Sequence, residues 1–243
     1  MQAKKYPRFR HAADHAVIVE FGESIDLATN LMVAALDRNL EHGPISGVLE
    51  TVPTYRSLCV CYDPLLIRSA ALIEELRCRI PDVSGASGPR RLWTVPIRYG
   101  GTGGRDLEDV ARLNGLTTEE VVTLHSQAHY RVYMIGFMPG YAYLGGLPKA
   151  LHTSRLSRPR PSEPRGSVAI GGTQTSIFSV QSPCGWRVVG HTPLRLFDPA
   201  RNPAILIHTG DEIRFEPVSA SRAEQLEKIS EAGGIPASYE VLG

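Results

Sequence analysis

The chain contains few cysteines, only four among 243 residues. The spacings between Cys59, Cys61, Cys78 and Cys184 include no Cys-x-x-Cys pair typical of a zinc site, and they do not suggest a disulfide framework. Cys59 and Cys61 stand two apart on an expected strand, so both side chains should point to one face. We therefore expect buried free thiols in a reducing cytoplasm.

The chain also lacks an excess of positively or negatively charged residues. The chain has 26 Lys and Arg against 25 Asp and Glu, a formal net charge of +1. This balance argues against nucleic acid or an anionic membrane as a partner. The basic group Lys4, Lys5, Arg8 and Arg10 is expected to be a solvated, disordered tail. No apolar run approaches the length of a membrane-spanning helix, and none follows the basic group as a signal peptide requires.

Several catalytic and ligand-binding motifs are absent. A Gly-x-Ser-x-Gly elbow is missing, which argues against an α/β-hydrolase, and no Met-Lys-Met biotin-attachment site occurs. The glycines of 100–104 lack the Lys-Ser/Thr ending of a P-loop, so a flexible turn competes with a phosphate cradle as their interpretation. His125 and His129 have the i, i+4 spacing of a zinc site on a helix, but without a following Glu or a third ligand we predict no metal.

The composition that remains is that of an ordinary globular protein, with 42% hydrophobic and 21% charged residues. In residues 11–80, two helical patterns and three β-rich runs predict a small N-terminal α/β sandwich with both helices on one side of the sheet. The first helix should be capped by Ser24 or Asp26, and the second should open at Asp63-Pro64 with Leu66 on its apolar face. The overall class is therefore α+β.

A stretch rich in Pro, Gly and Ser, residues 81–90, is the best candidate for a linker. Beyond it, residues 91–218 are mostly β-patterned, interrupted by a helix that starts at Asp106 and another that begins with the capping box 117–120. Residues 219–243 are expected to form one amphipathic surface helix and a tail.

The stretch from Gly136 to Asp198 organises the chain. Short β-rich runs alternate there with Gly and Pro, which indicates strands joined by shaped loops. These loops hold polar residues beside aromatic ones: Tyr141, Tyr143, Gln174, Thr175, Ser182 and Trp186. Rigid loops of this composition often build small-molecule pockets, although Gly and Pro that only mark turns would give the same pattern.

Three motifs in this stretch resemble a known family. They are Gly-Phe-x-Pro-Gly-aromatic-x-Tyr-Leu from Gly136, Gly-Ser-Val-Ala-Ile-x-Gly-x-Gln-Thr from Gly166, and Gly-Trp-x-x-x-Gly-x-Thr-Pro-x-x-Leu-Phe-Asp from Gly185. In this order they resemble the B subunit of 5-oxoprolinase, also called allophanate hydrolase subunit 1, a group that includes the kinase inhibitor KipI. The resemblance covers nearly the whole chain and implies that residues 91–218 form a cyclophilin-like β-barrel domain.

The resemblance implies a component of an ATP-dependent 5-oxoprolinase, which hydrolyses the lactam 5-oxoproline to L-glutamate. It implies ATP, with Mg, as the cofactor, bound on this chain or with a partner. It also implies the C and A subunits of 5-oxoprolinase as partners, so that this chain alone is inert or nearly so. Two other functions remain open: a KipI-like inhibitor of a sensor histidine kinase, and a carboxyltransferase-like half of a urea carboxylase or allophanate hydrolase system.

The resemblance, with the residue chemistry, suggests candidate site residues. His125 matches a family histidine that can orient or protonate a substrate, or that only packs a helix end. Arg160 can clamp a carboxylate or phosphate, or lie exposed in a loop; on sequence alone, Arg160→Ala should leave the melting temperature nearly unchanged. These two are the expected catalytic residues. The expected substrate-binding residues are Tyr141, Gln174, Thr175, Ser182, Trp186 and His191.

Four positions depart from the family pattern. His191 stands where Arg is usual, Cys184 and Ser176 stand where Gly is usual, and Arg165 replaces a small residue. Because histidine titrates near neutral pH, a fixed positive charge is lost at position 191. The part that His191 plays toward a carboxylate or phosphate is therefore in question.

Overall fold

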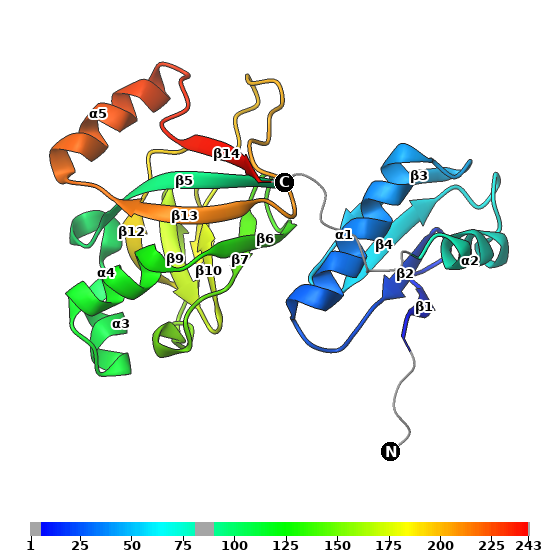
Figure 1. The fold of residues 1–243 in the computed structure, drawn as a ribbon, viewed down its shortest axis with the longest axis horizontal. Coiled ribbons are helices and arrows are strands. Elements are labelled where there is room, and N and C mark those ends of the chain that lie inside the picture. Colours follow the sequence, from blue (N-terminus) through cyan, green and yellow to red (C-terminus); the bar gives the residue numbers. More distant parts are fainter. Residues whose placement is uncertain (1–5, 81–89, 243) are drawn as a thin grey trace. The chain divides into compact units, whose positions relative to one another are not determined.

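The structure, a computed structural model, describes residues 6–80 and 90–242. The chain separates into two compact units, Met1–Gly88 and Pro89–Gly243, and each is described by itself. The expected linker 81–90 falls, except for Arg90, outside the described residues. The elements of both units are drawn in Figure 1.

The first unit contains a four-stranded antiparallel sheet. Its strand order is β1 (Arg8–His11), β2 (Ala16–Glu20), β4 (Ser57–Tyr62), β3 (Val48–Pro53). Alternate residues of β4 point to opposite faces: Leu58 and Val60 are fully buried, while Cys59 and Cys61 are only partly buried. One face of this sheet therefore carries the core of the unit.

Two helices cover that buried face. Helix α1 (Leu27–His42) begins at the N-cap Asp26, whose Oδ1 accepts a hydrogen bond from the Thr29 N–H at 2.9 Å, and it ends at Gly43. Helix α2 (Ser69–Cys78) buries Leu72 and Leu76. Side chains of both helices join those of β2 and β4 in one apolar cluster. The expected α/β sandwich is confirmed.

Three expectations for the first unit are wrong. Arg8 and Arg10 belong to strand β1, paired with β2, rather than to a disordered tail. Helix α2 starts at Ser69 instead of Asp63, because Asp63 forms a turn whose carbonyl accepts the Leu66 and Ile67 N–H groups, and this leaves Leu66 exposed. Cys78 is exposed instead of buried.

The second unit is a closed β-barrel of seven strands. The strand order around it is β12 (Arg187–His191), β9 (Ser167–Gly171), β10 (Gln174–Ile177), β7 (Ala142–Gly145), β6 (Tyr130–Ile135), β13 (Glu212–Pro217), β5 (Arg90–Tyr99). The long strand β5 closes the barrel by pairing with β12 at Arg98 and Tyr99. The expected α+β class, a small sandwich followed by a β-barrel, is confirmed.

The remaining elements lie around this barrel. They are η1 (Gly101–Gly104), α3 (Leu107–Asn114), α4 (Thr118–Gln127), η2 (Lys149–Leu151), β8 (Arg160–Glu163), β11 (Ser182–Cys184), α5 (Ala220–Glu231) and β14 (Ser238–Leu242). The capping box at the start of α4 is present as expected, formed by Thr117 and Glu120. The tail after α5, by contrast, returns as strand β14 along β5 (Figure 1).

Strand β9 separates two apolar regions of the second unit. Val168 and Ile170 belong to the main core, to which most barrel strands contribute. Ala169 lies between them in the sequence and therefore points the opposite way, into a smaller cluster outside the barrel wall. Strands β8 and β11 form a separate two-stranded antiparallel sheet, and Cys184 of β11 belongs to this outer cluster.

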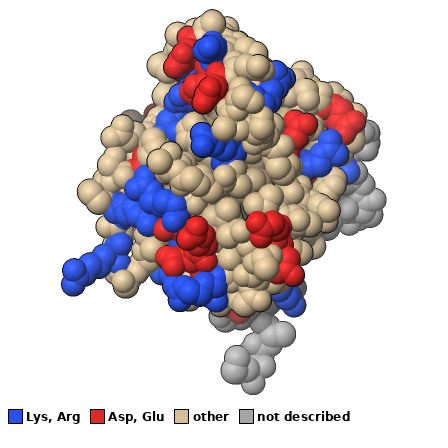
Figure 2. Space-filling model, turned by 90° about the vertical axis from the view of Figure 1, so that its left-hand side faces the viewer, with Lys and Arg blue, Asp and Glu red and all other residues tan. Residues whose placement is uncertain are grey.

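The surface carries charges of both signs. On the face shown in Figure 2, Lys and Arg side chains lie in small groups interspersed with Asp and Glu. In residues 6–80 and 90–242, no helix has the length and apolar character needed to cross a membrane.

Candidate functional site

The outer cluster borders a cavity of about 340 Å³. We call it the aromatic pocket, and its lining residues are Phe137, Tyr141, Tyr143, Arg155, Leu156, Pro159, Phe178, Pro183, Cys184, Gly185 and Trp186. It contains residues from the first and third sequence motifs. The two motifs, although far apart in the chain, therefore meet in space at this pocket.

Aromatic rings in edge-to-face contact form its walls. The ring centroids of Tyr141 lie 5.3 Å from Phe178 and 4.9 Å from Tyr143, and Tyr143 lies 6.2 Å from Trp186. Such contacts are favourable because the positive edge of one ring meets the negative face of the next. Tyr141 and Trp186 are only 3% and 6% exposed, so these walls are fixed by packing.

Two backbone features shape the aromatic pocket. A Cβ atom at Gly171 would lie 2.2 Å from Cδ2 of Trp186, so only glycine lets the indole lie flat against β9. Phe137 has a φ of +68°, a conformation that costs a non-glycine residue free energy. Its ring is 72% exposed at the edge of the pocket, in T-shaped contact with Tyr141. An exposed aromatic ring on a strained backbone is typical of a functional loop rather than of packing.

Arg155 supplies positive charge to the aromatic pocket. Its guanidinium carbon lies 5.5 Å from the ring centroid of Trp186, a cation–π contact, and its side chain is exposed. No Asp or Glu in the described part of the chain forms an ion pair with it. Burial raises the pKa of the nearby Tyr143 hydroxyl, and the charge of Arg155 opposes that shift. The Tyr143 hydroxyl therefore keeps its proton at neutral pH.

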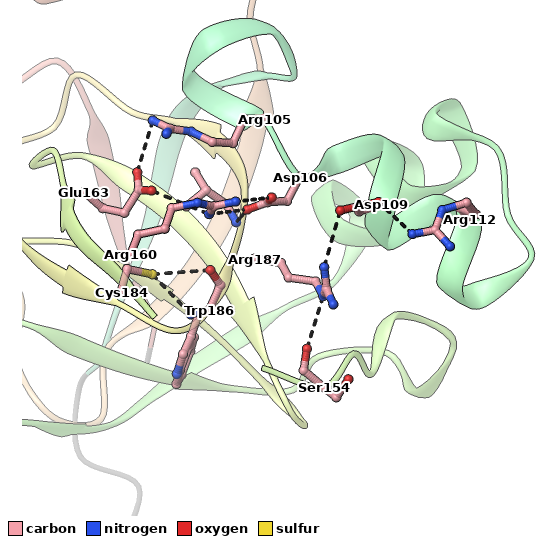
Figure 3. A network of polar contacts seen from close by, with 11 residues as sticks. Arg105, Asp106, Asp109, Arg112, Ser154, Arg160, Glu163, Cys184, Trp186 and Arg187 are labelled. Carbon is pink, nitrogen blue, oxygen red and sulfur yellow. Dashed lines mark hydrogen bonds and ion pairs between the residues drawn. The ribbon is translucent and has the colours of Figure 1, made fainter. Parts of the chain in front are cut away.

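Arg160 lies directly behind the pocket wall, in an ion-pair network shown in Figure 3. Its two terminal nitrogens donate to the carboxylate of Asp106 at 2.7 and 2.6 Å. Asp106 is buried and also accepts the Val188 N–H at 2.7 Å, so it joins the β8–β11 sheet to strand β12. These hydrogen bonds raise the pKa of Arg160 further. We call this pair the Asp106–Arg160 clasp.

A second carboxylate extends the network. Glu163 is fully buried, and its oxygens face the guanidinium groups of Arg105 at 3.4 Å and Arg160 at 3.5 Å. Farther along, Arg187 pairs with Asp109 at 3.5 Å and donates to the Ser154 carbonyl at 3.2 Å (Figure 3). This last bond fixes the backbone immediately before Arg155.

His125 and Thr175 lie together in the core of the barrel. The Thr175 hydroxyl donates to the Ala169 carbonyl at 3.1 Å, so it accepts from His125 Nε2–H at 3.0 Å. His125 Nδ1 then accepts from the Tyr99 hydroxyl at 2.7 Å. Full burial lowers the pKa of His125 to about 3. Its ring is therefore neutral, with both nitrogens occupied, and these contacts give it a structural role; a catalytic role stays a prediction.

His191 lies elsewhere, in a hollow of about 410 Å³ lined by Arg98, Thr102, Gly103, Pro164, His191, Ala223, Glu224 and Glu227. Its Nε2 donates to the Arg165 carbonyl at 3.0 Å, and burial lowers its pKa. The lining carries charges of both signs, from Arg98 and from the carboxylates of Glu224 and Glu227. The glycines of 101–104 form the short helix η1 at its rim.

The remaining expected residues do not line the aromatic pocket. Gln174 starts β10 opposite Gly171, and Ser182 is buried on β11 opposite Glu163. The structure thus brings Tyr141 and Trp186 together, with Arg160 and Ser182 on the β8–β11 sheet behind them. His125, Thr175 and His191 lie apart.

Sequence reasoning missed Arg155 as a pocket residue. Arg155, Arg158 and Arg160 stand within six positions, and sequence alone does not show which one is neutralised by a carboxylate. The partner of Arg160 is 54 positions away, at Asp106. Because that pairing depends on the tertiary fold, no local signal could single out Arg155.

Two further kinds of site, a metal centre and a reactive thiol, were considered for the described residues. In the described ranges, no group of three or more His, Cys, Asp and Glu side chains is placed to hold a metal ion. Helix α4 ends at Gln127, so His125 and His129 do not share a helix face, contrary to the zinc-site geometry considered above. Burial raises the pKa of the Cys184 thiol, which makes it a poor nucleophile at neutral pH.

Comparison with known proteins identifies the family. The family model described as carboxyltransferase domain, subdomain C and D, matches residues 7–207. The 5-oxoprolinase B subunit of Bacillus subtilis (strain 168) is 39% identical over 217 residues, which is 85% of this chain and 90% of that protein. The protein of the same name from Escherichia coli O157:H7 is 39% identical over 202 residues, 83% of this chain and 92% of that one.

A solved structure agrees with these matches. The crystal structure of TTHA0988 superposes with a TM-score of 0.76 at 34% identity, covering 84% of this chain and 40% of that chain. This chain thus spans less than half the length of that solved protein. The family model and the relatives together show that the chain belongs to the carboxyltransferase-domain family and, within it, to the B subunits of 5-oxoprolinase.

Proposed function

We propose that the chain is one component of an ATP-dependent 5-oxoprolinase complex that hydrolyses 5-oxoproline to L-glutamate. The observation that carries this proposal is the similarity over 90% of the Bacillus subtilis 5-oxoprolinase B subunit. Similarity that spans almost a whole relative supports a shared role in the complex, beyond a shared fold.

The chemistry explains why such a complex uses ATP. The five-membered amide ring of 5-oxoproline is unstrained, so its hydrolysis needs an activated intermediate. Phosphorylation of the amide oxygen would supply a good leaving group, and it requires cations and hydrogen-bond donors around the developing charge. The aromatic pocket fits this role in part, since it offers flat walls for a small ring and the cation Arg155.

The pocket residues also explain why partners are needed. Two of the titratable groups that line it, the Tyr143 hydroxyl and the Cys184 thiol, have pKa values raised by burial and hold their protons at neutral pH. Neither is suited to act as a general base. We therefore assign substrate binding to this chain, and we assign ATP with its Mg, and the phosphoryl transfer, to the complex with the C and A subunits.

Reconstitution tests the proposal. The chain is co-expressed with the cognate C and A subunits, the complex is isolated by size exclusion, and glutamate release from 5-oxoproline is measured with and without ATP. We expect turnover that requires all chains and ATP. A well-folded set of chains that neither co-elutes nor releases glutamate would refute the proposal and favour a KipI-like inhibitor, which is tested by autophosphorylation of a sensor histidine kinase.

The family model supports a second candidate. Its description, a carboxyltransferase domain, fits one half of a urea carboxylase or allophanate hydrolase system. In that case the biotin group would be on another chain. Carboxyl transfer from a carboxylated biotin carrier protein to urea, in the same reconstituted preparation, distinguishes this candidate from the first.

A further inference from the structure

We propose that the aromatic pocket is a binding site for a small ring that carries a carboxylate, and that Arg155 selects the negative charge of that ligand. The proposal rests on the proposed function only for the identity of the ring, which we take to be 5-oxoproline. The site itself follows from the shape of the pocket, from the balance of charges around it and from the contacts that fix Arg155.

Shape limits the ligand to something small and flat. The cavity of about 340 Å³ lies between rigid aromatic walls, and Tyr141, Phe178 and Trp186 are each at most 6% exposed. Flat π-surfaces suit a planar amide ring better than a flexible chain. The side chains of Leu156 and Pro159 complete an apolar enclosure around the same space.

Charge selects the substituent on the ring. Among the described residues that line the pocket, Arg155 is the one with a fixed charge. The two arginines of the adjacent network have acidic partners: Arg160 pairs with Asp106 at 2.6 Å, and Arg187 pairs at 3.5 Å with Asp109, which also pairs with Arg112. Arg155 has no such acid among the described residues, so its planar fork of N–H donors can bind a carboxylate through two hydrogen bonds.

The structure also holds Arg155 in place. Its guanidinium lies over the Trp186 ring, and Trp186 is itself held by the Cys184 Sγ, which accepts the Trp186 N–H at 3.2 Å. The preceding carbonyl, that of Ser154, is bonded to Arg187. A side chain that is already held in its binding position loses less conformational entropy when a ligand binds. The charge of Arg155 can therefore contribute more to the affinity for a carboxylate than a mobile surface arginine could.

The test measures binding to the full chain by calorimetry and by tryptophan fluorescence. The probes are 5-oxoproline, its uncharged amide 5-oxoprolinamide, in which a carboxamide replaces the carboxylate, and 2-pyrrolidone, which lacks this substituent. We expect the carboxylate to bind more tightly than either neutral ring. Arg155→Gln should weaken 5-oxoproline binding about 10- to 100-fold, the loss typical of a hydrogen bond to a charged group, and leave carboxamide binding unchanged. Arg155→Lys should restore part of the loss.

Arg158→Gln is the matched control, because Arg158 is an exposed arginine of the same segment that does not line the pocket. It should bind all three probes like the unaltered chain. Equal binding of acid and carboxamide, an unchanged affinity in Arg155→Gln, or no binding in either the isolated chain or the reconstituted complex would overturn the proposal. Binding of ATP that depends on Arg155 and excludes 5-oxoproline would do the same.

These outcomes are separate from the fate of the proposed function. If the complex carrying Arg155→Gln turns over 5-oxoproline as fast as the unaltered complex, the proposed function stands and the proposal for the aromatic pocket is refuted. If binding selects the carboxylate and depends on Arg155 but the complex shows no turnover, the proposal for the aromatic pocket stands and the proposed function is refuted.

Discussion

At the scale of single residues, His125 shows how burial changes the chemistry of a side chain. Its ring is fully buried and stacked on Phe215 with centroids 4.8 Å apart, and its pKa is lowered to about 3. An unfolded histidine has a pKa near 6.5. Between these two values the unfolded chain binds a proton that the folded chain does not, so stability falls as the pH is lowered through this window.

We therefore predict that His125 makes the second unit acid-sensitive. Its contribution to the free energy of unfolding should fall by about 2 kcal/mol between about pH 7 and pH 5, and it should be nearly constant above about pH 7.5. His125→Gln should be less stable at pH 7 but should show a flatter dependence on pH. The measurement is urea unfolding followed by tryptophan fluorescence, which reports the second unit because Trp93 and Trp186 both lie there.

His129→Gln is the control for this experiment, since His129 is exposed and lies four positions along the chain. It should keep the acid sensitivity of the unaltered protein. Identical pH slopes for His125→Gln and the unaltered chain would show that His125 is not the group responsible.

The residues of the site were predictable only in part. Tyr141 and Trp186 could be selected from sequence because they stand in the Gly- and Pro-rich motifs that carry the family resemblance, where shaped loops hold aromatic side chains beside polar ones. His125 could not be assigned, because a histidine that caps a core and one that transfers protons look the same in sequence. What separates them is burial and the occupation of both nitrogens by Tyr99 and Thr175.

At the scale of elements, the Asp106–Arg160 clasp links the two-stranded β8–β11 sheet to the barrel wall. Asp106 precedes α3, accepts the Val188 N–H of β12 and holds Arg160 of β8. Removal of one partner from a buried ion pair leaves an uncompensated charge, which costs about 3–5 kcal/mol. The side chain of Arg160 is 25% exposed and that of Asp106 is 4% exposed, so the low end of this range applies.

We predict that Arg160→Ala destabilises the second unit by about 3 kcal/mol and lowers its melting temperature by roughly 6–12 °C. This reverses the sequence-based expectation of an unchanged melting temperature, because the carboxylate that Arg160 clamps belongs to its own chain. Arg158→Ala, an exposed neighbour, should change stability by less than about 0.5 kcal/mol. Thermal unfolding followed by tryptophan fluorescence compares the two, and equal melting temperatures would exclude the clasp as a stabilising contact.

The elements themselves were largely predictable where patterns are strong. The α1 cap at Asp26 and the capping box of α4 were both expected, because each rests on local chemistry. Strands β1 and β14 were missed because both are edge strands, and edge strands have weak alternation and depend on a neighbour that lies elsewhere in the chain. The start of α2 was misplaced because Asp63-Pro64 forms a turn as readily as a helix start.

At the scale of the whole molecule, each unit has an apolar core of its own. The barrel is closed by the pairing of β5 with β12, and the first unit covers one face of its sheet with α1 and α2. A unit that buries its own apolar core and pairs its strands within itself does not need the other unit in order to fold. The Pro-, Gly- and Ser-rich composition of residues 81–89 fits a connection between such units.

We predict that a broad-specificity protease such as subtilisin first cuts the chain within or next to residues 81–89. The product that contains residues 90–243 should keep the tryptophan emission spectrum and the melting temperature of the second unit within a few degrees, because both tryptophans and the aromatic pocket lie in it. Mass spectrometry of a time course identifies the first cut. Early cleavage between Gly136 and Asp198, or loss of the cooperative transition once the units are separated, would show that the barrel depends on the first unit for its stability.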